Sequence, residues 1–214
     1  MPLPLPPEIN SSEMSADLEF AIFSARAAGE RALAIRATGR WSGDTLADVG
    51  DQAADGFLQG LVRGRYPEDG ILSEETADTR ARLSKSRVWI IDPLDGTREY
   101  SQMRDDWAVH VALTIDGRCA LGAVSLPAKG PTLWGVCSPG FESAGVEGVA
   151  AGSKDGLTKG DSPSGKPPRI AVSRSHTPAW TQRLADALGA ELVHAGSVGN
   201  KVGLLLLGEA DLYV

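Results

Sequence analysis

The sequence predicts an α/β protein, and three observations support this. Two long segments near the N-terminus carry apolar residues at helical spacing, short apolar runs follow as far as residue 136, and helix and strand patterns alternate after residue 168. We therefore expect an N-terminal domain with an antiparallel sheet and two helices laid on it, followed by a smaller α/β domain. The 214 residues are enough for one large or two small domains with a substantial core.

The first two elements are predicted to be helices. The proline-rich range 1–14 is expected to be a flexible lead-in. Apolar residues then recur three and four positions apart over 15–38, as one face of an amphipathic helix requires, and Gly39 ends the pattern. The range 45–62 repeats this spacing and carries Asp51, so this second helix would deliver a carboxylate toward the sheet.

The strands of the N-terminal domain are indicated by apolar runs and turn residues. The pair Asp116-Gly117 is a strong hairpin signal, and it separates strand-like segments at 106–115 and 118–126. Another strand is expected at 131–136. This part of the N-terminal domain therefore reads as antiparallel, and the whole domain is predicted to span 15–137.

A change of composition marks the expected domain boundary. Residues 138–168 are rich in Gly, Ser, Lys and Pro, which predicts a long loop or linker. The remaining range, 169–214, is predicted to form the smaller domain, with the active site in the cleft between the two domains. Its expected elements are a strand at 169–172, a helix at 178–188, a strand at 191–193 and a buried helix at 198–207.

Charge and cysteine content exclude several classes of protein. A formal net charge of −7 argues against a protein that coats nucleic acid, but bound divalent ions would still allow a phosphorylated substrate. Cys119 and Cys137 lie in apolar, strand-like contexts, so we expect reduced core thiols and no disulfide framework. The N-terminus does not resemble a signal peptide, and no segment is long and apolar enough to span a membrane. We therefore expect a cytoplasmic protein.

The most informative segment joins an apolar strand to two acids. Residues 88–91 are predicted to be buried on both faces, and the strand is expected to end at Asp92-Pro93, because proline interrupts a ladder. Asp92 and Asp95 would then share a tight turn, where two anions repel each other unless a cation joins them. Carboxylates suit Mg²⁺ or Mn²⁺, and the carbonyl of Leu94 is a further candidate ligand.

The residues after Asp95 suggest that a phosphate binds beside the metal. Gly96 permits close approach to the backbone, and the amides of Gly96, Thr97 and Arg98 could open a helix whose N-terminus favours anions. The alternative is an ordinary Asp-Pro turn in which the second Asp caps a helix. A second acidic element, Glu74-Glu75, follows another apolar run and favours the metal site, although isolated Glu pairs are usually solvated.

These motifs resemble the inositol monophosphatase superfamily of Mg²⁺-dependent, lithium-sensitive phosphatases. The resemblance is carried by segments spread over most of the chain: 70–75, 89–97, 196–201 and 208–213. Glu99, in Asp95-Gly96-Thr97-Arg98-Glu99-Tyr100, is similar to the bacterial CysQ-type phosphatases of 3'-phosphoadenosine 5'-phosphate, whereas inositol monophosphatases usually carry Asn there. The segments 105–110 and 171–176 also resemble the actinobacterial CysQ-type enzymes.

The resemblance implies a layered α/β/α/β/α sandwich, a homodimer and a set of roles for individual residues. Metal would be bound by Glu74, Asp92, Asp95 and the Leu94 carbonyl. Glu74 also belongs to the catalytic group, in which Asp51 pairs with Thr97 to activate water. The implied substrate contacts are Gly96, Thr97, Arg98, Ser173, His176, Ser197 and Lys201.

Several of these assignments have plain structural alternatives. His110 lies between two valines on a strand, where a hydrogen-bonded structural histidine is favoured over a catalytic one. His176 contacts substrate or caps a loop, and Lys201 contacts the nucleotide or extends to water from an apolar helix. Arg98 pairs with a second phosphate or lies on a helix surface.

We therefore expect a Mg²⁺-dependent phosphatase that removes the 3'-phosphate of 3'-phosphoadenosine 5'-phosphate, with Mn²⁺ as an alternative metal and Li⁺ as an inhibitor. Inositol monophosphatase or fructose-1,6-bisphosphatase activity is the second interpretation. Members of the resembled family continue into a W-x-x-D-like segment that completes a second metal site, and this sequence stops at Val214 before it. We accordingly expect the C-terminal domain to be truncated, and a third interpretation is an inactive metal-binding remnant.

Overall fold

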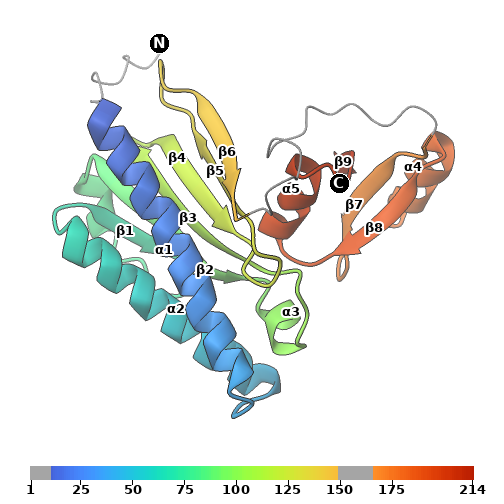
Figure 1. Cartoon of the computed structure of the whole chain (residues 1–214), viewed down its shortest axis with the longest axis horizontal. Coiled ribbons are helices and arrows are strands. Elements are labelled where there is room, and N and C mark those ends of the chain that lie inside the picture. Colours follow the sequence, from blue (N-terminus) through green and yellow to red (C-terminus); the bar gives the residue numbers. More distant parts are fainter. Residues whose placement is uncertain (1–10, 149–165) are drawn as a thin grey trace.

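The computed structural model describes residues 11–148 and 166–214, and it contains two sheets (Figure 1). The larger sheet has six strands in the order β1-β2-β3-β4-β5-β6, and the smaller sheet has three in the order β8-β7-β9. The elements of the smaller sheet and its helices, residues 169–214, are called the C-terminal unit below. The α/β class predicted from the sequence is confirmed.

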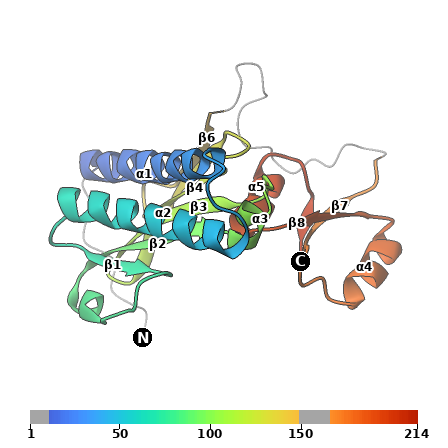
Figure 2. The same cartoon turned by 90° about the horizontal axis from the view of Figure 1, so that it is seen from below.

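Two long helices cover one face of the six-stranded sheet (Figure 2). Helix α1 spans Ser11–Ala37 and helix α2 spans Gly43–Arg65. Small residues of α1 at helical spacing, among them Ala21, Ala25 and Ala28, are fully buried and allow close packing on the strands. Both predicted helices are confirmed, and α1 begins at Ser11, inside the range expected to be a lead-in; residues 1–10 lie outside the described residues.

The acidic segments lie on the first two strands. Strand β1 (Gly70–Ser73) pairs in parallel with β2 (Arg87–Asp95), and the 3₁₀ helix η1 (Ala81–Ser84) lies between them in sequence. The short helix α3 (Thr97–Ser101) follows β2 directly. The parallel β1–β2 pair makes the sheet mixed, so the prediction of an antiparallel sheet holds only from β2 onward.

Two predictions for β2 were wrong. The strand does not end at Asp92, because its ladder with β3 continues past Pro93 to the pair Asp95–Ala108 through a shift in register. The strand is also not buried on both faces, since 38% of Ile90 is exposed. Side chains alternate between the two faces of a strand, and in the described residues α1 and α2 cover only the face that carries Trp89 and Ile91.

The remaining strands of the large sheet are antiparallel neighbours. They are β3 (Ala108–Ile115), β4 (Arg118–Ser125), β5 (Thr132–Val136) and β6 (Ser143–Glu147). The hairpin expected at Asp116-Gly117 is confirmed, and both residues have positive φ. Strand β6 contradicts the prediction that 138–168 is a loop throughout; residues 149–165 of that range lie outside the described residues.

The C-terminal unit alternates strand and helix, as predicted. Its elements are β7 (Arg169–Ser173), α4 (Trp180–Leu188), β8 (Glu191–Ala195), α5 (Val198–Leu206) and β9 (Leu212–Tyr213), and all strand pairs are parallel. Helix α5 packs back on the large sheet. A Cβ on Gly203 would stand 2.8 Å from the Leu126 side chain, so the helix lies very close to the strands.

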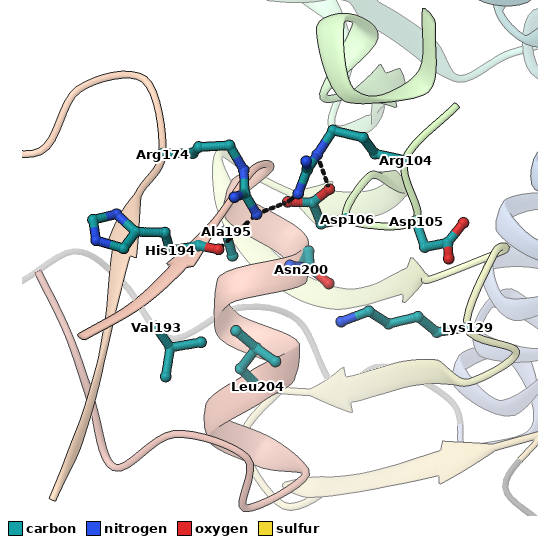
Figure 3. A pocket seen from close by; sticks show the side chains of 10 residues that line it. All are labelled: Arg104, Asp105, Asp106, Lys129, Arg174, Val193, His194, Ala195, Asn200 and Leu204. Atoms are coloured by element: carbon teal, nitrogen blue, oxygen red, sulfur yellow. Dashed lines mark hydrogen bonds and ion pairs between the residues drawn. The ribbon is translucent and has the colours of Figure 1, made fainter. Parts of the chain in front are cut away.

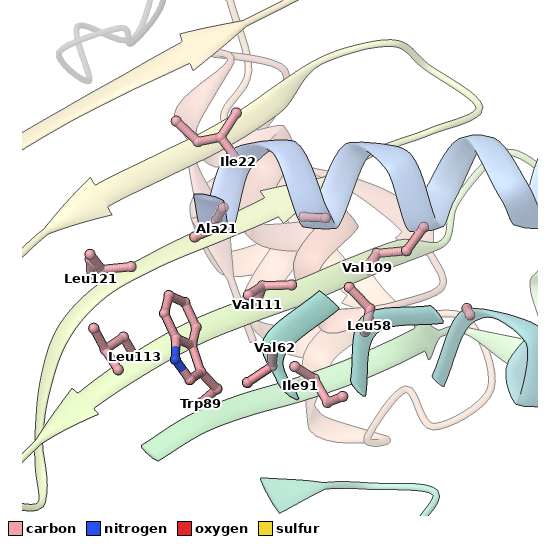
Figure 4. Close-up of a cluster of buried hydrophobic side chains, with 14 of the residues drawn as sticks. Ala21, Ile22, Leu58, Val62, Trp89, Ile91, Val109, Val111, Leu113 and Leu121 are labelled. Carbon is pink, nitrogen blue, oxygen red and sulfur yellow. The ribbon is translucent and has the colours of Figure 1, made fainter. Parts of the chain in front are cut away.

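The main core lies between the two long helices and the sheet (Figure 4). Leu58 and Val62 of α2 meet Trp89 and Ile91 of β2 there, and all four are at most 1% exposed. Burying one such large apolar side chain contributes about 1.5–3 kcal/mol. No helix in ranges 11–148 and 166–214 is long and apolar enough to cross a membrane.

The prediction that the two cysteines are core thiols was wrong. Cys119 and Cys137 are free but exposed, and they lie at neighbouring positions of β4 and the end of β5. Partial desolvation of the Cys119 thiol and its contact with Cys137 raise the pKa of Cys119 to about 11.

Candidate active site

The acidic turn predicted from the sequence lies at the end of β2, on the edge of the sheet that faces the C-terminal unit. Asp92 pairs with His110 across the β2–β3 ladder, and Asp95 pairs with Ala108. Gly96 follows with a φ of 95°, a left-handed conformation that glycine adopts without strain, and α3 begins at the next residue. The register of the β2–β3 ladder shifts between Asp92 and Asp95, and both acids lie at the same end of β2.

Three side chains form a compact cluster here. One ligand atom each of Asp92, Asp95 and His110 lies within 4.8 Å of the others. Burial and the nearby charges of Asp95 and Glu74 raise the pKa of Asp92 to about 6, against the opposing charge of His110. Burial and mutual repulsion disfavour the ionised form of crowded carboxylates, and a bound divalent cation stabilises that form. These residues therefore fit the hard metal that the sequence predicts.

Asp95 behaves differently from Asp92 because it has hydrogen-bond donors. Burial alone would raise the pKa of Asp95, but hydrogen bonds from His110, Ser197 and the Gly199 amide outweigh it and hold the pKa below its ordinary value. The same contact acts on the histidine. Burial disfavours its charged form, yet the bond to Asp95 and the charges of Asp92 and Glu74 raise the pKa of His110.

A second group of acids lies directly after β1 and on α2. The backbone amide of Glu74 donates to Ile91 O at 3.3 Å, which places Glu74 beside the residue that precedes Asp92. The Glu74 side chain is exposed and is outside the compact cluster. Asp51 on α2 is 8% exposed, and its Oδ1 has no hydrogen-bond partner among the described residues. Burial, with the charges of Glu75 and Asp92, raises the pKa of Asp51 to about 8.

The proposed phosphate-binding residues surround the start of α3. Thr97 is the first residue of that helix and is half-buried, whereas Arg98 is exposed. The Leu94 side chain is buried, and its backbone amide donates to the Asp92 carboxylate. Glu99 is buried against Gly196, where a Cβ would stand 2.3 Å from the Glu99 side chain.

The C-terminal unit supplies two of the predicted residues directly. Ser197 Oγ donates to Asp95 Oδ2 at 2.6 Å, and Lys201 Nζ donates to Ser197 O at 2.6 Å. Lys201 is 4% exposed, and burial lowers its pKa against the opposing charges of nearby acids. Ser173 is the last residue of β7 and His176 lies in the turn that follows. The His176 amide donates to Ser173 Oγ at 3.2 Å, and the His176 side chain is exposed.

Sequence reasoning missed three contributors. His110 was favoured as a hydrogen-bonded structural residue, and it does bond Asp95, but the sequence did not indicate that it belongs to the compact acidic cluster. Glu75, the neighbour of Glu74, raises the pKa of Asp51 through its negative charge. Asp106 joins the large sheet to the C-terminal unit. Only the pairing of Asp92 with His110 in the ladder could have identified the histidine, and a sequence does not give that register.

A pocket of about 380 Å³ lies beside the site, between the segment 104–106 that follows α3, helix α5 and strand β8 (Figure 3). Arg104 and Arg174 bind Asp106 at one end of it, and Asn200 and Lys129 extend toward each other at the side. Leu204 adds an apolar wall. The described residues therefore leave a hollow between the large sheet and the C-terminal unit.

Comparisons with known proteins agree with the geometry. The chain is 38% identical to a 3'-phosphoadenosine 5'-phosphate phosphatase of Mycobacterium leprae, over 97% of this chain and 72% of the relative. It is 30% identical to the 3'(2'),5'-bisphosphate nucleotidase CysQ of Escherichia coli, over 79% of this chain and 64% of the relative. A Mycobacterium bovis phosphatase of the same name as the first is 39% identical, and the match spans 60% of its length.

Solved structures give the same result. CysQ from Bacteroides thetaiotaomicron superposes with a TM-score of 0.68 at 27% identity, covering 92% of this chain and 79% of that one. The suhB protein of Bartonella henselae superposes with a TM-score of 0.72 at 18% identity, covering 92% and 76%, which shows the fold alone. Residues 13–214 match the inositol monophosphatase family, which confirms the resemblance noted in the sequence. The chain belongs to the inositol monophosphatase family.

Proposed function

We propose that the chain is a Mg²⁺-dependent phosphomonoesterase that hydrolyses the 3'-phosphate of 3'-phosphoadenosine 5'-phosphate to give AMP and phosphate. The observation that carries the proposal is the cluster of Asp92, Asp95 and His110 beside a buried, proton-binding Asp51. The names of the mycobacterial and Escherichia coli relatives support the nucleotide substrate.

We assign separate roles to the residues that bind the metal and to those that act on the attacking water. Asp92, Asp95, Glu74 and the Leu94 carbonyl would hold the cation. When bound, a divalent ion neutralises phosphate charge and makes a water molecule easier to deprotonate. Asp51, whose pKa lies near neutral pH, accepts the proton of the attacking water, and Thr97 orients that water.

The substrate is proposed to span the junction between the large sheet and the C-terminal unit. Gly96, Thr97 and Arg98 would hold the phosphate, with Glu74 in the catalytic group. Ser173, His176, Ser197 and Lys201 would contact the rest of the nucleotide. We also propose a second domain at 169–214, a cytoplasmic homodimer, activity with Mn²⁺ and inhibition by Li⁺. The first domain, predicted at 15–137, is larger than predicted, because α1 begins at Ser11 and β6 at 143–147 belongs to the large sheet.

The test is phosphate release from 3'-phosphoadenosine 5'-phosphate by the full chain, with Mg²⁺ or with EDTA. We expect Mg²⁺-dependent turnover that falls at least 100-fold in Asp92→Ala and Asp95→Ala, because each removes a metal ligand. Asp116→Asn is the matched control, since it changes an exposed aspartate at the far end of β3. Equal rates in EDTA and in all variants would refute the proposal.

The second candidate function differs only in substrate. Comparing kcat/KM for 3'-phosphoadenosine 5'-phosphate, inositol monophosphate and fructose 1,6-bisphosphate separates them. Glu99, buried against Gly196 beside the site, favours the nucleotide, because it occupies the position where inositol monophosphatases carry Asn.

A further inference from the structure

The Asp95 carboxylate is held by three donors, and all of them bind the same oxygen. Its Oδ2 lies 2.9 Å from His110 Nε2, and it accepts from Ser197 Oγ at 2.6 Å and from the Gly199 amide at 2.8 Å. His110 comes from β3, and the other two come from the start of α5. Among the described residues, no hydrogen bond reaches Asp95 Oδ1.

The hydroxyl of Ser197 is oriented by a second contact. Ser197 Oγ accepts from the Asn200 amide at 3.0 Å, as the N-cap of α5. A hydroxyl that accepts from one side has its own hydrogen free to donate, and here that hydrogen points to Asp95. Ser197 also has a φ of 54° and a ψ of 137°, a conformation that costs a non-glycine residue energy and persists only where its surroundings impose it.

Close packing of α5 on the sheet completes the arrangement. A Cβ on Gly199 would stand 2.6 Å from His110 Nε2 and 2.8 Å from the Ala108 Cβ. Only glycine therefore lets this amide reach Asp95 between the helix and the strand. Ser197, with its unfavourable backbone conformation, and Gly199, where only glycine fits, both donate to the same carboxylate oxygen. This indicates that the turn before α5 is shaped to hold Asp95 Oδ2.

We propose that Ser197, His110 and the Gly199 amide are positioning groups that saturate Asp95 Oδ2 and leave Oδ1 to bind the cation. The inference deepens the proposed function and rests on it for the presence of a metal. Asp95 then binds metal through one oxygen, and the metal affinity of the large sheet depends on α5 of the C-terminal unit. Ser197 then acts on the metal through Asp95, in addition to the nucleotide contact proposed above.

The experiment measures Mn²⁺ affinity of the full chain from the electron paramagnetic resonance signal of free Mn²⁺, without substrate. Removing a donor that orients a metal ligand typically weakens metal binding 10- to 100-fold, and we expect this for Ser197→Ala and for His110→Leu. His110→Gln should restore affinity to within about threefold, because its amide keeps an N–H donor of similar reach. Ser84→Ala, which removes an exposed hydroxyl bonded only to Ala81 O, should bind as the wild type does.

A double-mutant cycle separates positioning from a general loss of structure. In an Asp95→Asn background, Ser197→Ala should weaken Mn²⁺ binding no further, because its target carboxylate is gone. Wild-type affinity in folded Ser197→Ala and His110→Leu, additive effects in the cycle, or failure of His110→Gln to restore binding would each overturn the inference. A chain that binds Mn²⁺ as expected but hydrolyses no 3'-phosphoadenosine 5'-phosphate would refute only the proposed function.

Discussion

Asp51 is the residue at which stability and activity should oppose each other. Its folded pKa of about 8 is above the ordinary aspartate value near 4, so the folded chain keeps a proton that the unfolded chain releases. A group that binds a proton more tightly in the folded state loses stability as pH rises through the window between those two values. Metal-free protein should therefore become less stable between about pH 4 and pH 8.

We predict that Asp51→Asn stabilises the metal-free chain, by on the order of 1 kcal/mol at pH 8 and by less at pH 5, while abolishing turnover. Urea unfolding in EDTA at the two pH values measures the effect. Asp55→Asn, one turn further along α2, is the contrasting variant. Asp55 accepts from Ser73, Thr76 and Gln59, so an amide at this position loses acceptors and should destabilise the chain. If Asp51→Asn is destabilising at pH 8, the account of its pKa is wrong.

At the residue scale, sequence reasoning succeeded where an acid follows an apolar run directly. Asp92 follows the apolar run 88–91 directly, Asp95 was predicted to share its turn, and the structure brings the two together. His110 carries no comparable signal, because a histidine between two valines on a strand favours a structural role. Its partnership with Asp95 arises from the pairing of β2 with β3 and from the approach of α5, which are both long-range consequences of folding.

At the scale of elements, the fit of α2 against α3 depends on one glycine. A Cβ on Gly50 would stand 2.5 Å from the buried Tyr100 ring, whose hydroxyl is fixed by a 2.8 Å hydrogen bond to Ala32 O. We predict that Gly50→Ala lowers the free energy of unfolding by about 1–2 kcal/mol, because overpacking outweighs the gain in helix propensity. Gly60→Ala on the same helix has no heavy atom within 4 Å of its Cβ and should instead stabilise by about 0.5–1 kcal/mol.

Thermal unfolding of the two variants beside the wild type tests this contrast. Shifts of Tm in the same direction would mean that helix propensity, and not the contact with Tyr100, decides the outcome at Gly50. The rate of phosphate release by Gly50→Ala should also fall, because Asp51 is the next residue and a displaced α2 would move the Asp51 carboxylate.

The elements that the sequence predicted are those with a strong internal period. Helices α1 and α2 carry apolar residues three and four positions apart. Both were predicted from this spacing, and their predicted ends differ from the observed ends by a few residues. Strand β6 was missed because its residues 143–147 include only two apolar side chains besides glycine, and it forms by pairing with β5. Gly145 also leaves space for the Trp134 ring, a cross-strand fit that is invisible in a local pattern.

At the scale of the whole molecule, Asp106 is the charged link between the large sheet and the C-terminal unit (Figure 3). It accepts from Arg104 Nε at 2.8 Å within its own segment, and from Arg174 Nη2 at 2.8 Å and the Gly196 amide at 2.7 Å across the junction. Burial would raise the pKa of Asp106, but these donors outweigh it and hold the pKa far below its ordinary value. The residue therefore anchors the turns that precede α5 and follow β7.

We predict that Asp106→Asn lowers the free energy of unfolding by about 2 kcal/mol at pH 7, because a neutral amide cannot satisfy three donors that converge on a buried carboxylate. Since the folded pKa is depressed, the contribution of Asp106 is present above the unfolded value near 4 and is lost as pH falls below it. The difference in free energy of unfolding between Asp106→Asn and the wild type should shrink in urea unfolding at pH 3.

Asp105→Asn is the matched control. The Asp105 carboxylate is next in sequence to Asp106, but its side chain is 69% exposed and its Oδ1 lies 3.7 Å from Arg36 Nη2. Equal losses in the two variants would show that the junction does not depend on Asp106. Proteolysis within residues 169–214 should rise selectively in Asp106→Asn, because freeing Arg174 and Gly196 loosens the C-terminal unit before the large sheet.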